Sequence, residues 1–136
     1  MGMVMMRVYV VTEGMYSDMY IAGTATSLVD AARIVAEKAC VDAPSISAFE
    51  GGGEVEGKGT LCCMFCNLQS GEISPTVERA IQAVPENVTV PPIVKVFPDA
   101  NWSPAVFVIG TDRSKVAQAF SDTLAAEAIK RGWAIG

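Results

Sequence analysis

Twice along this chain, two short runs rich in β-branched and aromatic residues are followed by an alanine-rich run with helical spacing. The strand-like runs are 5–12, 19–25, 93–97 and 106–109. Alternating apolar residues separated by turn residues indicate β-hairpins, whereas apolar residues three and four apart indicate helices. The helical runs extend from Ser27 to Cys40 and from near Thr111 or Asp112 to Arg131. These patterns predict an α+β fold in which each hairpin leads into a helix.

The two hairpin–helix units also share residues. When the first is laid over the second, the matched pairs are Tyr16-Ser17 with Trp102-Ser103, Gly23-Thr24 with Gly110-Thr111, Ser27 with Ser114, Val29 with Val116, and Ala32 with Ala119. This internal similarity favours a duplicated ββα unit. We therefore expect a two-layer sandwich, an antiparallel sheet with helices on one face. A chain of 136 residues is predicted to form a single domain over 1–136.

Local signals locate the remaining elements. Ser27 followed by Asp30 is typical of a helix N-cap, and Gly132 is well placed to end the last helix. In the middle of the chain, 45–50 and 60–68 are predicted to form a second hairpin around a glycine-rich loop. The run 77–84 has apolar residues at helical spacing after a Ser-Pro pair, which predicts a short helix.

Composition restricts the classes of partner. Apolar residues make up 51% of the chain and charged residues 18%, with a net charge of −5, which argues against nucleic-acid binding. A mean hydropathy of +0.34 leaves little polar surface, so we expect burial between subunits of a homo-oligomer. No run approaches the roughly 20 apolar residues of a membrane helix, and no signal peptide is recognised. We expect a cytoplasmic protein with reduced cysteines.

Enzyme chemistry finds little support in the sequence. There is no histidine, which removes the commonest general base and histidine-ligated zinc. The run 52–60 ends in Gly-Lys-Gly-Thr, similar to a phosphate-binding P-loop in which Lys58 and Thr60 would contact phosphate and magnesium. Glu54 and Glu56 stand where phosphate oxygens would lie, so a flexible hairpin loop is the favoured interpretation. We predict no catalytic residue and no cofactor.

Four cysteines allow a second chemistry. A closed zinc site would need all of them, namely Cys40, Cys62, Cys63 and Cys66. On a strand, Cys63 and Cys66 would point to opposite faces, with Cys62 on the same side as Cys66. We therefore expect core residues and no metal site. The alternative is a small cysteine-dependent redox or thiol enzyme, which requires a thiolate with a pKa depressed by a neighbouring cation.

The hairpin tips are the candidate recognition sites. Each places an aromatic side chain beside hydrogen-bonding groups, which suits a planar ligand or a protein partner. The candidate binding residues are Tyr16, Asp18, Asn101, Trp102 and Arg113. A nucleotide-like ligand would also need cations for its phosphates, and the candidates outside the C-terminal turn are Arg7, Arg33, Lys95 and Arg113.

The opening third of the chain carries a resemblance. Its residues are Val8-Tyr9-Val10-Val11-Thr12-Glu13-Gly14, Tyr16-Ser17-Asp18 and Ile21-Ala22-Gly23, followed by the alanine-rich helix. This pattern resembles small accessory proteins encoded by bacteriophages. The resemblance implies a non-enzymatic protein that acts by binding, as an inhibitor of a host defence protein or as a sponge for a nucleotide signal. A purely structural or assembly protein is the remaining alternative.

Overall fold

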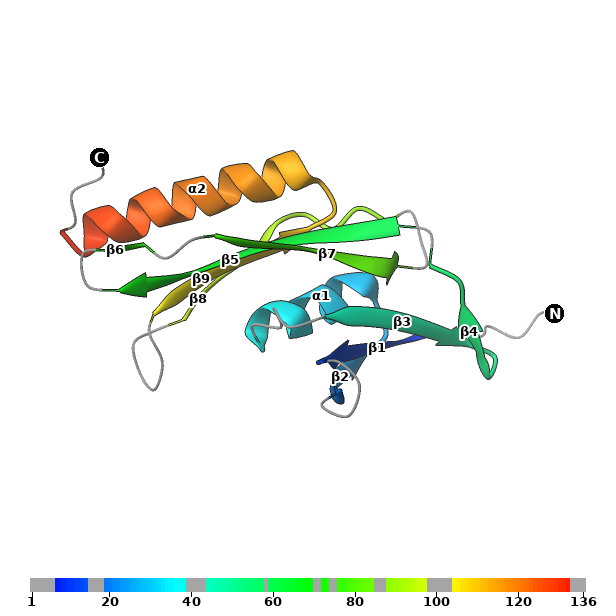
Figure 1. Cartoon of the computed structure of the whole chain (residues 1–136). Helices are drawn as coiled ribbons and strands as arrows, with labels where there is room; N and C mark the ends of the chain where they lie inside the picture. The colour runs from blue at the N-terminus through cyan, green and yellow to red at the C-terminus, as the bar shows by residue number, and fades with distance from the viewer. Residues whose placement is uncertain are drawn as a thin grey trace.

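A computed structural model describes residues 7–14, 19–38, 44–57, 59–69, 72–73, 76–84, 88–97 and 104–132. The elements in chain order are β1 (Arg7–Glu13), β2 (Tyr20–Ala25), α1 (Leu28–Glu37), β3 (Ser45–Glu50), β4 (Gly53–Val55), β5 (Gly59–Gln69), β6 (Glu72–Ile73), β7 (Val77–Val84), β8 (Ile93–Phe97), β9 (Ala105–Gly110) and α2 (Arg113–Lys130). They form two antiparallel sheets and two helices (Figure 1).

The first sheet has the strand order β2-β1-β3-β4. Its central strands alternate between a buried and a more open side: Tyr9 and Val11 are buried on β1, and Ile46 and Ala48 on β3. This alternation is what a strand with one face toward the core requires. At the edge, the register of β1 with β2 shifts between Val11 and Thr12, so β2 carries one extra residue, a β-bulge.

The second sheet has the order β6-β5-β9-β8, with β7 also paired to β5. All six residues of β9 are buried. Phe107 and Ile109 belong to the core cluster that contains α1, whereas Val106 and Val108 belong to the cluster that contains α2. The two helices therefore cover opposite faces of this sheet, and α1 lies between the two sheets (Figure 1).

The predicted α+β fold with antiparallel strands and helices layered against them is confirmed. The structure has more layers than the sequence predicts, because it divides the strands into two sheets and covers the second on both sides. The helix caps are also confirmed. The Ser27 hydroxyl accepts a hydrogen bond from the Asp30 backbone N–H, and Gly132 adopts a φ of 73° just beyond α2.

Two predictions for the middle of the chain are wrong. The run 77–84 is strand β7, not a helix, because its backbone pairs with β5 from Gly59 to Phe65. Its apolar spacing fits either element, and pairing with a buried strand decides between them. The predicted hairpin of 45–50 with 60–68 does not form, since β3 and β5 lie in different sheets. Instead Gly51 and Gly52, with φ of 61° and 83°, turn β3 back into β4.

The hairpin–helix order does occur twice, as β1-β2-α1 and β8-β9-α2. The matched residues do not all take the same role. Ser27 is the N-cap of α1, whereas Ser114 is the second residue of α2 and Asp112 is its cap. The matched glycines do correspond, because a Cβ at Gly23 would meet Ile34 of α1 and one at Gly110 would meet Val116 of α2.

Candidate functional site

Most of the predicted recognition residues fall outside the described part of the chain. Tyr16, Asp18, Asn101 and Trp102 lie in 15–18 and 98–103, so their predicted role stays a prediction. Only Arg113 is described, as the first residue of α2.

Arg113 is held by a neighbouring strand. Its Nε lies 2.5 Å from Oε1 of Glu78 on β7, and its Nη2 lies 3.0 Å from Oε2. This bidentate contact raises the pKa of Arg113 and lowers the pKa of Glu78 below its usual range. Arg113 therefore ties the start of α2 to β7.

The other cations proposed to meet phosphates have intramolecular contacts as well. Arg7 on β1 donates to Oε2 of Glu50 from Nε at 2.9 Å and from Nη2 at 2.7 Å. Arg33 Nη1 lies 3.0 Å from Oδ1 of Asp30, and Lys95 Nζ lies 5.9 Å from the centre of the Phe97 ring. A phosphate would have to compete with a carboxylate for each of the three arginines.

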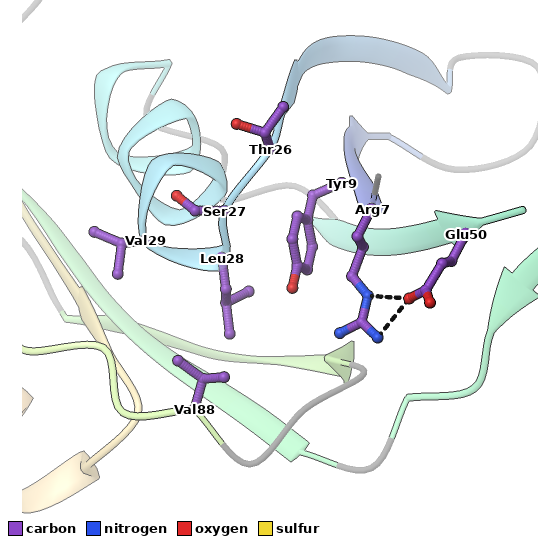
Figure 2. Close-up of a pocket in the computed structure, with 8 residues that line it drawn as sticks. All are labelled: Arg7, Tyr9, Thr26, Ser27, Leu28, Val29, Glu50 and Val88. Carbon is purple, nitrogen blue, oxygen red and sulfur yellow. Dashed lines mark hydrogen bonds and ion pairs between the residues drawn. The ribbon is translucent and has the colours of Figure 1, made fainter. Parts of the chain in front are cut away.

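Arg7 and Glu50 border a cleft in the first sheet. This cavity has a volume of about 450 Å³ and lies between the start of α1 and strands β1 and β3. Figure 2 shows the residues that line it. Tyr9, Thr26 and Ser27 contribute hydroxyl groups, and Leu28, Val29 and Val88 contribute apolar walls. The hydrogen bond to Glu50 raises the pKa of Arg7 above its ordinary value. The charges of Arg7 and Glu50 have opposite signs and offset each other at the edge of the cleft. The cleft thus suits a neutral polar molecule better than an anion.

Of the three described cysteines, Cys63 and Cys66 are core residues, whereas Cys62 is half-buried. Cys63 packs in the cluster around α1 and Cys66 in the cluster around α2, which confirms their predicted opposite faces. Burial raises the pKa of each thiol to about 11, and burial followed by the charge of Glu78 raises that of Cys62. A redox enzyme needs the opposite shift. Among the described residues no group of three potential metal-binding side chains occurs, and Cys40 lies outside them.

The P-loop interpretation of 52–60 is wrong. A P-loop requires a helix directly after the glycine-rich turn, since the helix N-terminus completes the phosphate cradle. Here Thr60 is an exposed residue of strand β5, and Glu54 lies on strand β4. Lys58 lies outside the described residues.

The feature that sequence reasoning missed is the outer face of the first sheet, the side turned away from α1. Cross-strand pairs place Val8 beside Phe49 and Thr12 beside Ile21, with Val10 and Thr24 between them. Ile21 is 65% exposed and Phe49 is 39% exposed. The two serines of β3 that share this face, Ser45 and Ser47, are also uncharged.

In the part of the chain that the structure describes, charge appears at the margin of the outer face, where Glu54 of β4 lies opposite Phe49 and the exposed Glu56 follows. The signal was present in the sequence, because residues 8, 10 and 12 and residues 45, 47 and 49 alternate with the buried positions. Polar residues are expected on the solvent side of such a strand, and here that side is apolar or merely hydroxylated.

Within the described part of the chain, neither helix has the length and apolar character needed to cross a membrane. Comparison with protein-family models, with curated proteins and with solved structures finds no match. The function is therefore inferred from the residues of this chain alone.

Proposed function

We propose that this chain is a non-enzymatic binding protein that recognises a protein partner through the outer face of the first sheet. The observation that carries the proposal is the large apolar exposure of Ile21 and Phe49 on a face without a charged side chain at its centre. Exposed apolar patches with a polar margin are typical of protein contact sites. A flat face of this kind offers a planar nucleotide neither an enclosing pocket nor a cation.

The charges define the chemistry of the partner. Glu54 and Glu56 border the face at β4, and the chain carries a net charge of −5. The matching surface has an apolar centre and lysine or arginine at one margin, since opposite charges at a rim speed association and exclude wrong partners. A host protein of this chemistry agrees with the accessory proteins of bacteriophages that the N-terminal third resembles. On this proposal the protein acts in the cytoplasm as an inhibitor of a defence protein.

The intramolecular contacts of the cations favour an inhibitor over a nucleotide sponge. Arg7, Arg33 and Arg113 each contact a carboxylate, and separating such a pair to bind phosphate would leave that carboxylate without its partner. The raised pKa values of the cysteines likewise weigh against a thiol enzyme.

The test is site-specific photo-crosslinking in the producing cell. A benzophenone amino acid replaces Phe49, and the matched control carries it at Val94, which is 44% exposed on edge strand β8 of the second sheet. We expect one reproducible heterologous product from position 49 and none from position 94. Adding Ser47→Arg, which puts a bulky cation in the centre of the face, should remove that product while the unfolding midpoint stays unchanged.

Four outcomes would contradict the proposal. Equal crosslinking from positions 49 and 94 would mean that the outer face has no special role. A crosslinked product that still forms in the Ser47→Arg variant would also mean that the outer face has no special role. A nucleotide-sized extra mass on the gently purified protein, seen by native mass spectrometry, would instead support the sponge. A defined oligomer with no heterologous product would favour the structural or assembly role.

A further inference from the structure

Strand β2, the edge of the first sheet, differs from the other edge strands that the structure describes. Its residues are Tyr20-Ile21-Ala22-Gly23-Thr24-Ala25, and none is charged. The charged residues on the other edges are Glu54 on β4, Glu72 on β6, Glu78 and Arg79 on β7, and Lys95 on β8. Charged residues on an edge discourage pairing with another chain. Only β2, among these strands, lacks that protection.

The side chains of β2 are also unusually exposed and apolar. Met19, just before the strand, is 58% exposed, Tyr20 is 55% exposed and Ile21 is 65% exposed. Tyr20 and Ile21 lie on opposite faces, because Tyr20 pairs with the buried Glu13 and Ile21 with Thr12. The bulge is the one protective device on this strand, which has neither lysine nor proline. A strand with these features is suited to pairing along the edge that no described strand occupies.

The absence of charge on β2 favours a second copy of this chain as the strand that pairs with it. When a strand pairs antiparallel with its own copy, a two-fold axis places its residues opposite residues of the same strand. A charged strand would then bring like charges together, which destabilises the pair. At a net charge of −5 two copies repel each other at a distance, so an uncharged edge is where they can meet most readily. The low share of charged residues in the chain, 18%, agrees with a buried contact.

We propose that two copies of this chain pair β2 to β2 in antiparallel orientation, so that their two four-stranded sheets become one continuous sheet. The pairing places the two outer faces side by side and doubles the surface offered to a partner. The dimer itself stands on the edge strand. Only the statement about the doubled surface rests on the proposed function.

The experiment measures mass in solution by sedimentation velocity over a range of concentrations. The wild-type chain should sediment as a dimer of the 14.3 kDa monomer. Ile21→Lys places like charges across the two-fold axis, and we expect its dissociation constant to rise at least tenfold. Thr24→Lys, a second exposed position on β2, should act in the same way. The matched control is Val94→Lys on β8, where we expect no change.

Hydrogen exchange shows which edge is covered. Amides of 20–25 should be protected in the concentrated wild-type protein and should exchange faster in Ile21→Lys, whereas amides of 93–97 should be unaffected. A wild-type chain that is monomeric at every concentration would overturn the inference. A dimer that persists in both lysine variants with fast exchange in 20–25 would also overturn it.

The two proposals fail separately. A monomeric wild type that still gives the heterologous crosslink from position 49 removes the dimer and keeps the binding function. A dimer paired through β2 that gives no heterologous crosslink from position 49 keeps the dimer and removes the binding function.

Discussion

The two sheets differ in how many of their faces are buried. On β1 of the first sheet, Tyr9 and Val11 are buried while Val8 and Val10 remain partly open. On β9 of the second sheet every residue is buried, because α1 packs on one side and α2 on the other. The second sheet thus contributes residues to both core clusters, whereas the first sheet keeps one face partly exposed.

The phenylalanines of the two sheets provide the largest test of this comparison. Phe107 of β9 is fully buried and meets Phe65 edge-on, with ring centres 6.2 Å apart. Phe107→Ala should lower the free energy of unfolding by about 3–5 kcal/mol, since it removes a large side chain and leaves a cavity. Phe49→Ala, on the outer face, should change it by less than about 1 kcal/mol. Urea unfolding at equilibrium measures both. Equal losses would show that the outer face is covered in the folded protein.

The matched glycines come next in expected effect. A Cβ at Gly110 would lie 3.0 Å from a methyl group of Val116, 3.1 Å from the backbone oxygen of Val90 and 3.3 Å from Cα of Pro92. That backbone is held in place, because Val90 exchanges hydrogen bonds with Thr111. Gly110→Ala should therefore destabilise the protein by about 1–3 kcal/mol through overpacking.

Gly23 is the counterpart in the first sheet. A Cβ there would meet only side-chain atoms of Ile34, the nearest at 3.1 Å. Because that side chain can rotate, Gly23→Ala should destabilise the protein by less than about 1 kcal/mol. Thermal unfolding of the two variants compares them directly. A larger loss at Gly23 would mean that α1 is held more rigidly than α2.

The ion pairs give the smallest effects. The Arg7–Glu50 side chains in the first sheet are 23% and 31% exposed, whereas those of Arg113–Glu78 are 63% and 42% exposed. Water screens the second pair more strongly. Glu50→Gln should therefore lower the melting temperature more than Glu78→Gln, with the exposed Glu54→Gln as a control for the change in net charge. The reverse order would contradict the screening argument.

The Glu78 pair should also depend on pH. The pKa of Glu78 is lowered in the folded protein. The ion pair therefore stabilises the fold at a pH above the pKa that Glu78 has in the unfolded chain, and this stabilisation is lost as Glu78 becomes protonated at lower pH. The difference in melting temperature between wild type and Glu78→Gln should be present at neutral pH, shrink as the pH falls below the unfolded value of about 4.3, and vanish only below the lower folded pKa. A difference that persists in acid would show that Glu78 acts through something other than its charge.

The sequence predicted correctly those features of the fold that depend on residues close together in the chain. The Ser27 cap, the positive φ at Gly132 and the strands at 93–97 and 106–109 are set by neighbouring residues, and these predictions are confirmed. Strand β7 was mistaken for a helix because its eight residues, five of them apolar, are too few to distinguish a helical period from a strand period. Only its pairing with β5, over a long sequence separation, settles the choice.

The candidate site was less predictable. Arg113 could be singled out as a cation near a loop, but its contact with Glu78 requires α2 and β7 to meet in space. The exposure of Phe49 and Ile21 was hidden for a similar reason, since an apolar residue on a strand is expected to face the core.

By itself the sequence determined the α+β class, the two hairpin–helix units, the helix caps and the opposite faces of Cys63 and Cys66, because each follows from spacing along a few residues. The tertiary structure alone decided how the strands divide between two sheets, which sheet is buried on both faces and which apolar residues remain exposed. Those properties depend on contacts between distant segments, and the pattern along a single strand does not say what will pack against it.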